Sequence, residues 1–235
     1  MKKIVVFTGA GVSRDSGIAT FRDSDGLWAN HRIEDVCTPE ALVRNRAKVI
    51  EFYNIRRKEL LSKSPNAGHY AIKELEKYFD VEVVTQNIDD LHERAGSENI
   101  THLHGELRKL RSSDNTSLIS SIEGWEQTLD ARAEDNSLLR PFVVFFGEAV
   151  PMFDEAAKIV ADADILVIVG TSLAVYPAAS LIRYIRKDVP VWLVDPNPPV
   201  VSGMSNELHH IKENSITGLP RLVELLIDMA NKKND

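Results

Sequence analysis

The sequence predicts an open, doubly wound α/β sheet of parallel strands, Rossmann-like in type, with a small lobe inserted into it. The first observation behind this prediction is a set of short runs rich in valine, isoleucine and other apolar residues, with the composition of buried strands: Ile4–Thr8, Val81–Val84, Phe142–Phe145, Ile165–Val169 and Val191–Val194. These runs lack the strict alternation of apolar and polar residues seen in a sheet with one wet face, so we expect both faces of the sheet to be covered.

The second observation is that helical patterns lie between several of these runs. Apolar residues recur at helical spacing in Gly68–Phe79, Phe153–Ala161, Pro177–Arg186 and Leu219–Ala230. Strand–helix alternation of this kind is typical of a parallel sheet that carries helices on both faces.

Two segments break the alternation and predict the small lobe. In residues 26–66, Thr38 is a candidate N-cap and Pro39 takes the first helical position, so a long helix could follow to about Leu61. Residues 107–139 are rich in serine, aspartate and asparagine, and Ser112–Thr116 predicts a loop. We therefore expect a single domain over residues 1–235. Its Rossmann-like part would comprise residues 1–25, 67–106 and 140–235, and its small lobe residues 26–66 and 107–139.

Composition limits the partners that we expect. The chain has 235 residues, 43% hydrophobic and 27% charged, which is the mix of a soluble globular protein. Its net charge of -7 argues against a general affinity for nucleic acid or for an anionic membrane, because either needs a basic face.

The first apolar run stops at Gly9, too early for a signal peptide, and no run is long enough to cross a bilayer. We expect a cytoplasmic protein.

A glycine-containing turn, Gly9–Ser13, follows the first strand directly. Glycines at such a turn let the backbone approach a pyrophosphate, and the N-terminus of a following helix attracts the anion. The next glycine is Gly17, which departs from the usual G-x-G-x-x-G spacing, and the usual acidic residue about twenty positions later is not in place. Taken alone, the turn fits a phosphate site and a plain strand-to-helix turn about equally well.

Five sequence blocks together closely resemble the signatures of the sirtuin family. In chain order they are GAGVSRDSGIATFR from Gly9, TQNIDDLH from Thr85, LHGE from Leu103, RPFVVFFGE from Arg140 and GTSLAVYPAA from Gly170. They come in the family's order and span most of the chain, so chance agreement is not a serious alternative. The resemblance implies an NAD-dependent protein-lysine deacylase that consumes NAD and acts on an acylated-lysine protein or peptide.

The resemblance implies an NAD site as well. The glycine turn would hold phosphate, Gln86 would contact the ribose, and Asn87 and Asp89 would line the nicotinamide pocket, whose carboxamide needs both donors and acceptors. The full set of cofactor-binding residues is Gly9, Ala10, Gly11, Ser13, Ile18, Phe21, Arg22, Trp28, Gln86, Asn87, Ile88, Asp89, Gly170, Thr171, Ser172, Val175, Asp195 and Asn197. Phe21 and Arg22 would belong to a loop over the nicotinamide ribose.

In the family mechanism His104 would be the general base, with Asn87 and Asp89 as the other catalytic residues. The acyl-amide oxygen attacks the anomeric carbon of the nicotinamide ribose, nicotinamide leaves, and a ribose hydroxyl must then lose its proton to attack the alkylimidate. Histidine suits this step because its reference pKa lies near neutrality. The products would be nicotinamide, the free lysine and an O-acyl-ADP-ribose.

Four of the other histidines have structural interpretations. We expect His102 to be a packing or surface residue, His92 to end a helical turn, and His209–His210 to lie in a solvated loop.

The acyl-lysine substrate would lie against Val144, Phe146 and Gly147, one wall of a tunnel in which an extended peptide pairs with the backbone. Tyr53 and Arg56 are three residues apart in the expected long helix and share one face. A Tyr-x-x-Arg here resembles the signature of the sirtuin branch that removes succinyl and malonyl groups. The chemistry fits this resemblance, because an arginine fork and a tyrosine hydroxyl can bind the carboxylate of such a group. The alternative is a pair of side chains on a solvated helix.

Zinc-bearing sirtuins carry two Cys-x-x-Cys pairs in the small lobe, and this chain departs from that pattern. Its single cysteine is Cys37, so no thiolate zinc site is possible and we expect no bound zinc. Apolar residues at helical spacing would replace the metal by packing a helix on the main domain: Leu118, Ile119, Ile122, Trp125 and Leu129.

Two other functions remain open on the sequence. The same scaffold could serve an NAD hydrolase or ADP-ribosyltransferase, in which water or another nucleophile replaces the acyl-lysine. It could also serve a non-catalytic NAD-sensing module, for which we would expect Asn87, Asp89 or His104 to be lost, and all three are present.

Overall fold

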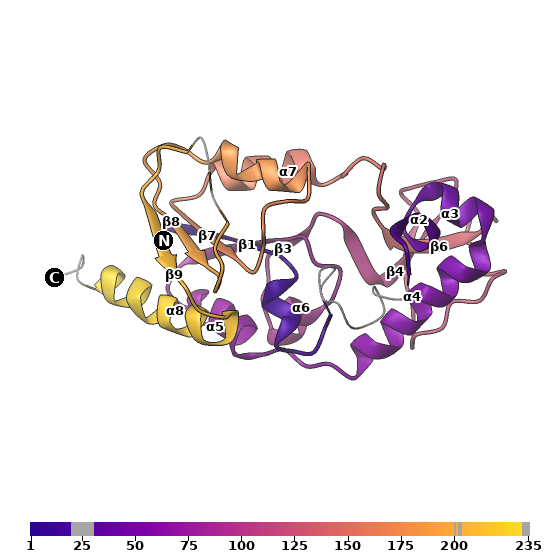
Figure 1. The fold of residues 1–235 in the computed structure, drawn as a ribbon, viewed down its shortest axis with the longest axis horizontal. Helices are drawn as coiled ribbons and strands as arrows, with labels where there is room; N and C mark the ends of the chain where they lie inside the picture. The colour runs from indigo at the N-terminus through magenta and orange to yellow at the C-terminus, as the bar shows by residue number, and fades with distance from the viewer. Residues whose placement is uncertain (20–30, 200, 202–203, 232–235) are drawn as a thin grey trace.

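The computed structural model describes residues 1–19, 31–199, 201 and 204–231, and a six-stranded parallel sheet forms its centre (Figure 1). The strands lie in the order β3-β2-β1-β7-β8-β9. Their bounds are β1 Lys3–Thr8, β2 Asp80–Thr85, β3 Ile100–His102, β7 Ile165–Val169, β8 Val191–Val194 and β9 Leu208–Ile211. Strand order reverses between β1 and β7, which confirms the predicted doubly wound sheet.

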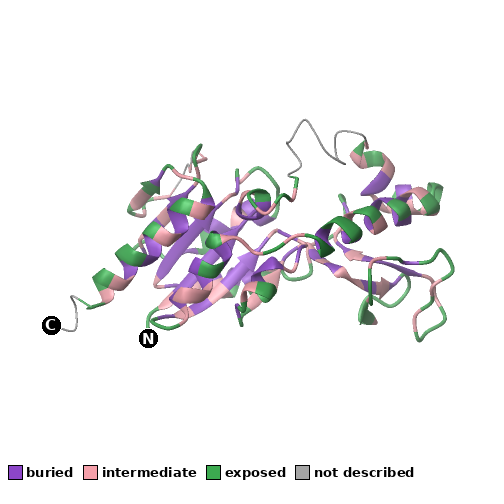
Figure 2. Ribbon diagram, turned by 90° about the horizontal axis from the view of Figure 1, so that it is seen from below, coloured by how far each residue is buried: buried purple, intermediate pink, exposed green. Residues whose placement is uncertain are grey.

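Helices cover both faces of this sheet, as the apolar runs predict. Ile4 and Val6 of β1 pack against α5 and α8 on one face, whereas Val5 and Phe7 pack against α7 and the 3₁₀ helix η2 on the other. All four side chains are fully buried, and Figure 2 shows the central strands of the sheet largely in purple, the colour of buried residues. The covering elements are α5 Ala67–Leu75, α7 Phe153–Ala161, η2 Ala178–Tyr184 and α8 Ser215–Asn231.

The small lobe lies at one end of the molecule and contains a second sheet, antiparallel and ordered β5-β4-β6 (Figure 1). Phe52, Tyr53, Leu107, Val143 and Phe145 belong to its apolar core. The remaining elements are α1 Gly11–Arg14, α2 Ile33–Val36, α3 Pro39–Arg44, α4 Arg46–Leu61, α6 Leu91–Ala95, β4 Gly105–Ser112, β5 Ile119–Ser121 and β6 Leu139–Val143.

A buried arginine fixes the irregular part of the small lobe to α4. The Arg57 guanidinium donates to the carbonyl oxygens of Leu107 and Trp125, at 3.1 and 2.9 Å. It also donates to the side-chain oxygens of Asn54 and Gln127, at 2.5 and 3.3 Å. Burial lowers the pKa of Arg57 to about 10, so the group is still charged at neutral pH. Charge-assisted hydrogen bonds to neutral oxygens therefore hold together a segment that lacks an apolar core of its own.

The prediction of a fifth parallel strand at Phe142–Phe145 is wrong. The strand in this region is β6, which ends at Val143 and pairs antiparallel with β4 in the small sheet. Apolar composition shows that a strand is buried, but it does not show which sheet buries it.

The long helix predicted from Pro39 to Leu61 is two helices. Thr38 caps α3 as predicted, because its Oγ1 accepts from the Ala41 N–H at 3.1 Å. Asn45 then leaves helical geometry with a φ of -149°, and its side chain accepts from the Lys48 N–H and starts α4. An asparagine that caps a new helix competes with continuation of the old one.

The helix predicted over Leu118–Leu129 is also wrong. Strand β5 and irregular backbone occupy this segment, and Ile119 and Leu129 are 44% and 51% exposed, so they form no mini-core. Strands β3 and β9 were not predicted, because they are short and partly polar. His209 and His210 both lie in β9 rather than in a loop, and the His209 ring is stacked on that of Trp192 at 4.3 Å. Among the helices of the described residues, none combines the length and apolarity needed to cross a bilayer.

Arg57→Met should destabilise the protein by roughly 3–5 kcal/mol, because it leaves several buried oxygens without a donor. Urea unfolding measures the change. Glu51→Gln, on the exposed side of the same helix, is the matched control and should change the stability by less than about 0.5 kcal/mol. Equal unfolding midpoints for Arg57→Met and the wild type would show that the arginine does not hold the lobe.

Candidate active site

A cavity of about 920 Å³ lies between the parallel sheet and the small lobe. Residues that follow β1, β2, β7 and β8 form part of its wall, where doubly wound sheets bind ligands. It brings together these predicted site residues: Ala10, Gly11, Ser13, Ile18, Tyr53, Arg56, Gln86, Asn87, Ile88, Asp89, His104, Val144, Phe146, Gly147, Gly170, Thr171, Ser172, Val175, Asp195 and Asn197. Gly9 does not line it, and Phe21, Arg22 and Trp28 lie outside the described residues.

The glycine turn is shaped by a contact between two loops. The Gly9 N–H donates to Val169 O at 3.1 Å, and the Gly11 N–H donates to Gly170 O at 2.8 Å. A Cβ atom on Gly11 would stand 2.6 Å from Gly170 Cα, which is closer than atoms can approach. Glycine is therefore required for the carboxyl ends of β1 and β7 to meet, whatever ligand the turn also binds.

His104 stands where the chain passes from the parallel sheet into the small lobe. Its Nδ1 lies 3.0 Å from Gln86 O. A carbonyl oxygen can only accept, so Nδ1 carries the proton and Nε2 of the neutral ring keeps its lone pair. Burial lowers the pKa of His104, although the bond to Gln86 opposes the shift. At neutral pH the ring is therefore uncharged and able to accept a proton.

Asn87 and Asp89 converge on the hydroxyl of Ser13. Asn87 Nδ2 donates to Ser13 Oγ at 3.1 Å, and Ser13 Oγ donates to Asp89 Oδ2 at 3.0 Å. His69 Nε2 lies 3.4 Å from the same hydroxyl. The Asn66 N–H donates to His69 Nδ1 at 3.2 Å, which places the His69 proton on Nε2 and makes that atom a donor to Ser13. These contacts orient the amide and the carboxyl at the cavity wall.

Burial changes the ionisation of this group. It raises the pKa of Asp89, while the bonds from the Leu91 N–H and Ser13 oppose the rise. It lowers the pKa of His69 to about 4, so His69 is neutral at neutral pH. His92 lies fully buried near the start of α6 rather than at the end of a helical turn, and burial holds its pKa well below the ordinary value. Its Nε2 lies 3.1 Å from Thr8 Oγ1, so His92 is a neutral structural group.

Gln86 presents a hydrogen-bond donor to the cavity. Thr171 Oγ1 donates to Gln86 Oε1 at 2.9 Å, which fixes the orientation of the amide. Gln86 Nε2 is buried and has no hydrogen-bond partner among the described residues. A buried donor without an acceptor is unfavourable by roughly 1–3 kcal/mol, so this atom indicates a place where a ligand oxygen would bind.

Tyr53 and Arg56 of α4 both reach the cavity. Tyr53 is fully buried with its ring stacked near Phe145, and its hydroxyl donates to Cys37 Sγ at 3.2 Å. Burial holds the pKa of Tyr53 well above its ordinary value, so the hydroxyl keeps its proton. The guanidinium carbon of Arg56 lies 5.9 Å from the centre of the Tyr53 ring.

An ion pair shapes the wall that follows β6. Arg140 donates to both carboxylate oxygens of Glu148, at 2.6 and 3.1 Å, and the Phe145 N–H donates to the same carboxylate at 2.7 Å. The Arg140 guanidinium also lies over the Phe145 ring, 3.9 Å from its centre. This network fixes the turn that presents Phe146 and Gly147 to the cavity.

Sequence reasoning missed several residues of the site. Asn214 and Ser215 line the cavity at the start of α8, and Lys63 lines it after α4. Asn214 follows β9 at the same edge of the sheet as the predicted ligand residues, so a correct prediction of β9 would have found it. His69 gave no comparable signal, because its contact with Ser13 joins distant parts of the chain.

The segment in which zinc-bearing sirtuins carry their cysteines offers no thiolate or imidazole ligand in this chain. Residues 107–139 contain no cysteine or histidine, and Cys37 lies in the cavity wall beside Tyr53. Within the described residues, the one group of three potential ligands is Glu93, His102 and Glu106, which offers no thiolate.

Comparison with known proteins agrees with this geometry. Residues 9–177 match the model of the Sir2 family. The NAD-dependent protein deacylase of Bacteroides thetaiotaomicron is 50% identical over 232 residues, which cover 97% of this chain and 99% of that protein.

Solved structures agree as well. A Sir2 homologue in complex with NAD superposes with a TM-score of 0.87 and 36% identity, over 97% of this chain and 91% of that one. A Sir2 variant with a deacetylated p53 peptide and 3′-O-acetyl ADP-ribose superposes with a TM-score of 0.78 and 28% identity, over 94% and 92%. With a family model that spans most of its length and a relative half identical over nearly all of it, this chain belongs to the Sir2 family, the sirtuins.

Proposed function

We propose that this sirtuin is an NAD-dependent protein-lysine deacylase that transfers the lysine's acyl group to ADP-ribose and accepts both acetyl and acidic acyl groups. The observation that carries the proposal is one cavity lined by neutral His104, by Gln86, whose buried Nε2 has no hydrogen-bond partner among the described residues, and by Arg56. The names of its relatives support the reaction class.

NAD would lie along the carboxyl ends of the parallel strands. The loops after β1 and β7 would hold its phosphates, with Asp195 and Asn197 near the adenosine ribose. Gln86 Nε2 would donate to an oxygen of the other ribose, which satisfies the buried donor. Asn87 and Asp89 would face the nicotinamide carboxamide, one as an amide donor and the other as a carboxyl.

In the proposed reaction the amide oxygen of the acyl-lysine bonds to C1′ of the ribose as the bond from C1′ to nicotinamide breaks. Nicotinamide leaves as a neutral molecule. His104 Nε2 then accepts the proton of a ribose hydroxyl, whose oxygen attacks the former amide carbon. Addition of water completes the release of free lysine and O-acyl-ADP-ribose. A protonated His104 has no lone pair for this step, so its lowered pKa favours the reaction at neutral pH.

The acyl preference follows from charge. A succinyl or malonyl tail ends in a carboxylate, which is very costly to bury unpaired. Arg56 supplies the opposite charge at the cavity wall. The Tyr53 hydroxyl donates to the Cys37 sulfur, a weak acceptor, and a carboxylate is a much stronger one. An acidic acyl group would therefore take over the Tyr53 hydrogen bond at little loss.

Measured nicotinamide release separates the candidate functions. A deacylase releases nicotinamide only when an acylated peptide is present and yields O-acyl-ADP-ribose in equal amount. An NAD hydrolase or ADP-ribosyltransferase releases it without acyl-lysine. A sensing module binds NAD and releases none. The assay needs a panel of acetyl-, succinyl-, malonyl- and long-chain acyl-lysine peptides, read by mass spectrometry.

His104→Ala should lower deacylation by on the order of 10²-fold or more, with NAD binding retained, because the residue moves a proton rather than holding NAD. In the wild type the rate should fall as pH drops through the pKa of His104, which lies below the ordinary histidine value, since protonation removes the lone pair. Product formation against pH and NAD affinity by calorimetry test both points. Unchanged turnover in the variant would place the base elsewhere.

Arg56→Met should weaken turnover of succinyl-lysine by roughly 2–5 kcal/mol in kcat/KM and that of acetyl-lysine far less, because only the acidic tail loses a charge partner. Tyr53→Phe should show a smaller loss with the same selectivity. Matched succinyl and acetyl peptides of one sequence supply the comparison. Lys58→Met, on the exposed side of α4, is the control and should leave both rates unchanged. An equal fall on the two substrates would rule out an acyl-carboxylate clamp.

The purified protein should contain no stoichiometric zinc, because residues 107–139 offer neither thiolate nor imidazole ligands. Elemental analysis after chelator washing measures the content, and the melting temperature should be the same with and without chelator. About one zinc per chain would refute this expectation.

A further inference from the structure

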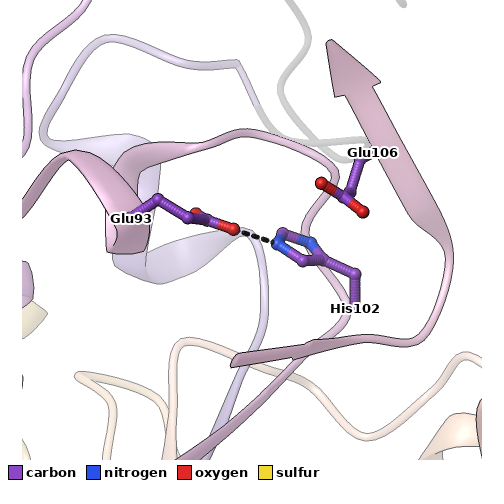
Figure 3. A group of neighbouring side chains, drawn as sticks. All are labelled: Glu93, His102 and Glu106. Carbon is purple, nitrogen blue, oxygen red and sulfur yellow. Dashed lines mark hydrogen bonds and ion pairs between the residues drawn. The ribbon is translucent and has the colours of Figure 1, made fainter. Parts of the chain in front are cut away.

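His102 lies two residues before His104. Whereas His104 contacts the carbonyl oxygen of Gln86, His102 contacts that of the next residue, Asn87. Its Nδ1 lies 2.8 Å from Asn87 O, and its Nε2 lies 2.7 Å from Glu93 Oε1. The side chain is only 7% exposed. Figure 3 shows the contact with Glu93, with Glu106 of β4 approaching the ring from the other side and not bonded to it.

These two contacts determine the protonation of the ring. A carbonyl and a carboxylate oxygen can only accept, and a neutral imidazole has a single N–H. A neutral His102 would therefore satisfy one oxygen and present a lone pair to the other. Only the imidazolium donates to both at these distances.

The charges around the ring favour that cation. Glu93 of α6 and Glu106 of β4 face it, and Lys109 opposes them by donating to Glu106 at 2.8 Å. The Asp89 carboxyl and the neutral His92 are the other titratable groups near it. Burial alone would lower the pKa of His102, but the hydrogen bond and charge of Glu93, together with the Asn87 carbonyl and the charge of Glu106, outweigh it and raise the pKa.

We propose that His102 is a positioning residue for nicotinamide release: its imidazolium, held by Glu93, anchors the Asn87 carbonyl and so fixes Asn87 and Asp89 where they face the nicotinamide. The inference rests on the proposed function, which assigns the nicotinamide to those two residues. His102 itself touches no substrate. Loss of its charge leaves one of its two acceptors without a donor, and the Asn87 backbone is then free to shift.

A metal ion is the competing interpretation of this cluster, since one ligand atom from each of Glu93, His102 and Glu106 lies within 4.8 Å of the others. The present contacts oppose it. Lys109 already binds Glu106, and His102 would have to lose the Nε2 proton that bonds to Glu93.

Nuclear magnetic resonance of the chelator-treated enzyme without NAD tests the ion pair directly. In the wild type, both ring nitrogens of His102 should carry protons at neutral pH, and the carbonyl carbon signal of Asn87 should titrate together with the ring. Glu93→Gln keeps the shape but removes the charge, and should lower the His102 pKa by about one unit or more. A wild-type ring that carries one proton at neutral pH, or one that changes on addition of zinc, overturns the proposal.

The activity arm tests the positioning role, with Glu98→Gln in the exposed turn before β3 as the charge control. Because the proposal requires the positively charged form of His102, kcat/KM for NAD should fall as the pH rises through the pKa of His102. Glu93→Gln should move this alkaline limb of the pH profile to lower pH. For a shift of one unit, the loss should be about threefold midway between the wild-type and variant limbs and should approach tenfold above both. The KM for peptide and the acidic limb set by His104 should not move, nor should the control variant change.

An alkaline limb that stays in place while the His102 titration shifts would reduce the residue to a structural role and overturn the proposal. Absence of nicotinamide release from the wild type with every acyl peptide contradicts the proposed function instead. In that case the titration of the Asn87 carbonyl in the free enzyme still decides whether His102 holds this segment.

Discussion

Four consecutive carbonyl groups, those of residues 85–88, all accept hydrogen bonds from the segment 102–107, and the site depends on this contact. The donors, in the order of the carbonyls, are Leu103 N at 2.9 Å, His104 Nδ1 at 3.0 Å, His102 Nδ1 at 2.8 Å and Leu107 N at 2.7 Å. One set of hydrogen bonds therefore joins the segment that carries Asn87 and Asp89 to the segment that carries His104. Gly105 makes the set possible, because it turns the chain with a φ of +80° and a Cβ there would stand 2.2 Å from Phe142 O.

The sequence predicted the parts of this site that depend on local pattern and on family motifs. The apolar runs placed β1, β2, β7 and β8, and ligand residues follow from the ends of such strands. It could not place contacts between distant segments, such as His69 with Ser13 or Asn87 with His102. A histidine has no periodic signature, so its role is decided by partners that only the fold brings to it.

The small lobe shows the same limit. Spacing at i and i+3 is compatible with a helix in residues 118–129, yet the chain there forms a short strand and turns. The stabilising interaction is polar and comes from elsewhere, because Arg57 of α4 donates to the carbonyl of Leu107, which precedes that segment, and to the carbonyl of Trp125 within it. One buried cation with neutral acceptors thus links loops that bury little apolar surface. Such a group cannot be recognised from hydrophobic pattern alone.

The histidines around the segment that carries Asn87 and Asp89 show how the neighbours of a side chain set its charge. Burial lowers the pKa of His69 to about 4 and also lowers those of His92 and His104, whereas the Glu93 carboxylate raises that of His102. For the three histidines whose pKa is lowered, the unfolded chain binds protons before the folded chain does as the pH falls below about 6.5. The stability that these neutral histidines contribute is therefore lost toward acid pH. For His102 the ion pair contributes fully below that pH and is lost as the pH rises through its folded pKa. A neutral His104 and a charged His102 thus coexist only at a pH above the pKa of His104 and below that of His102, and the roles proposed for both would confine the working pH of the site to that range.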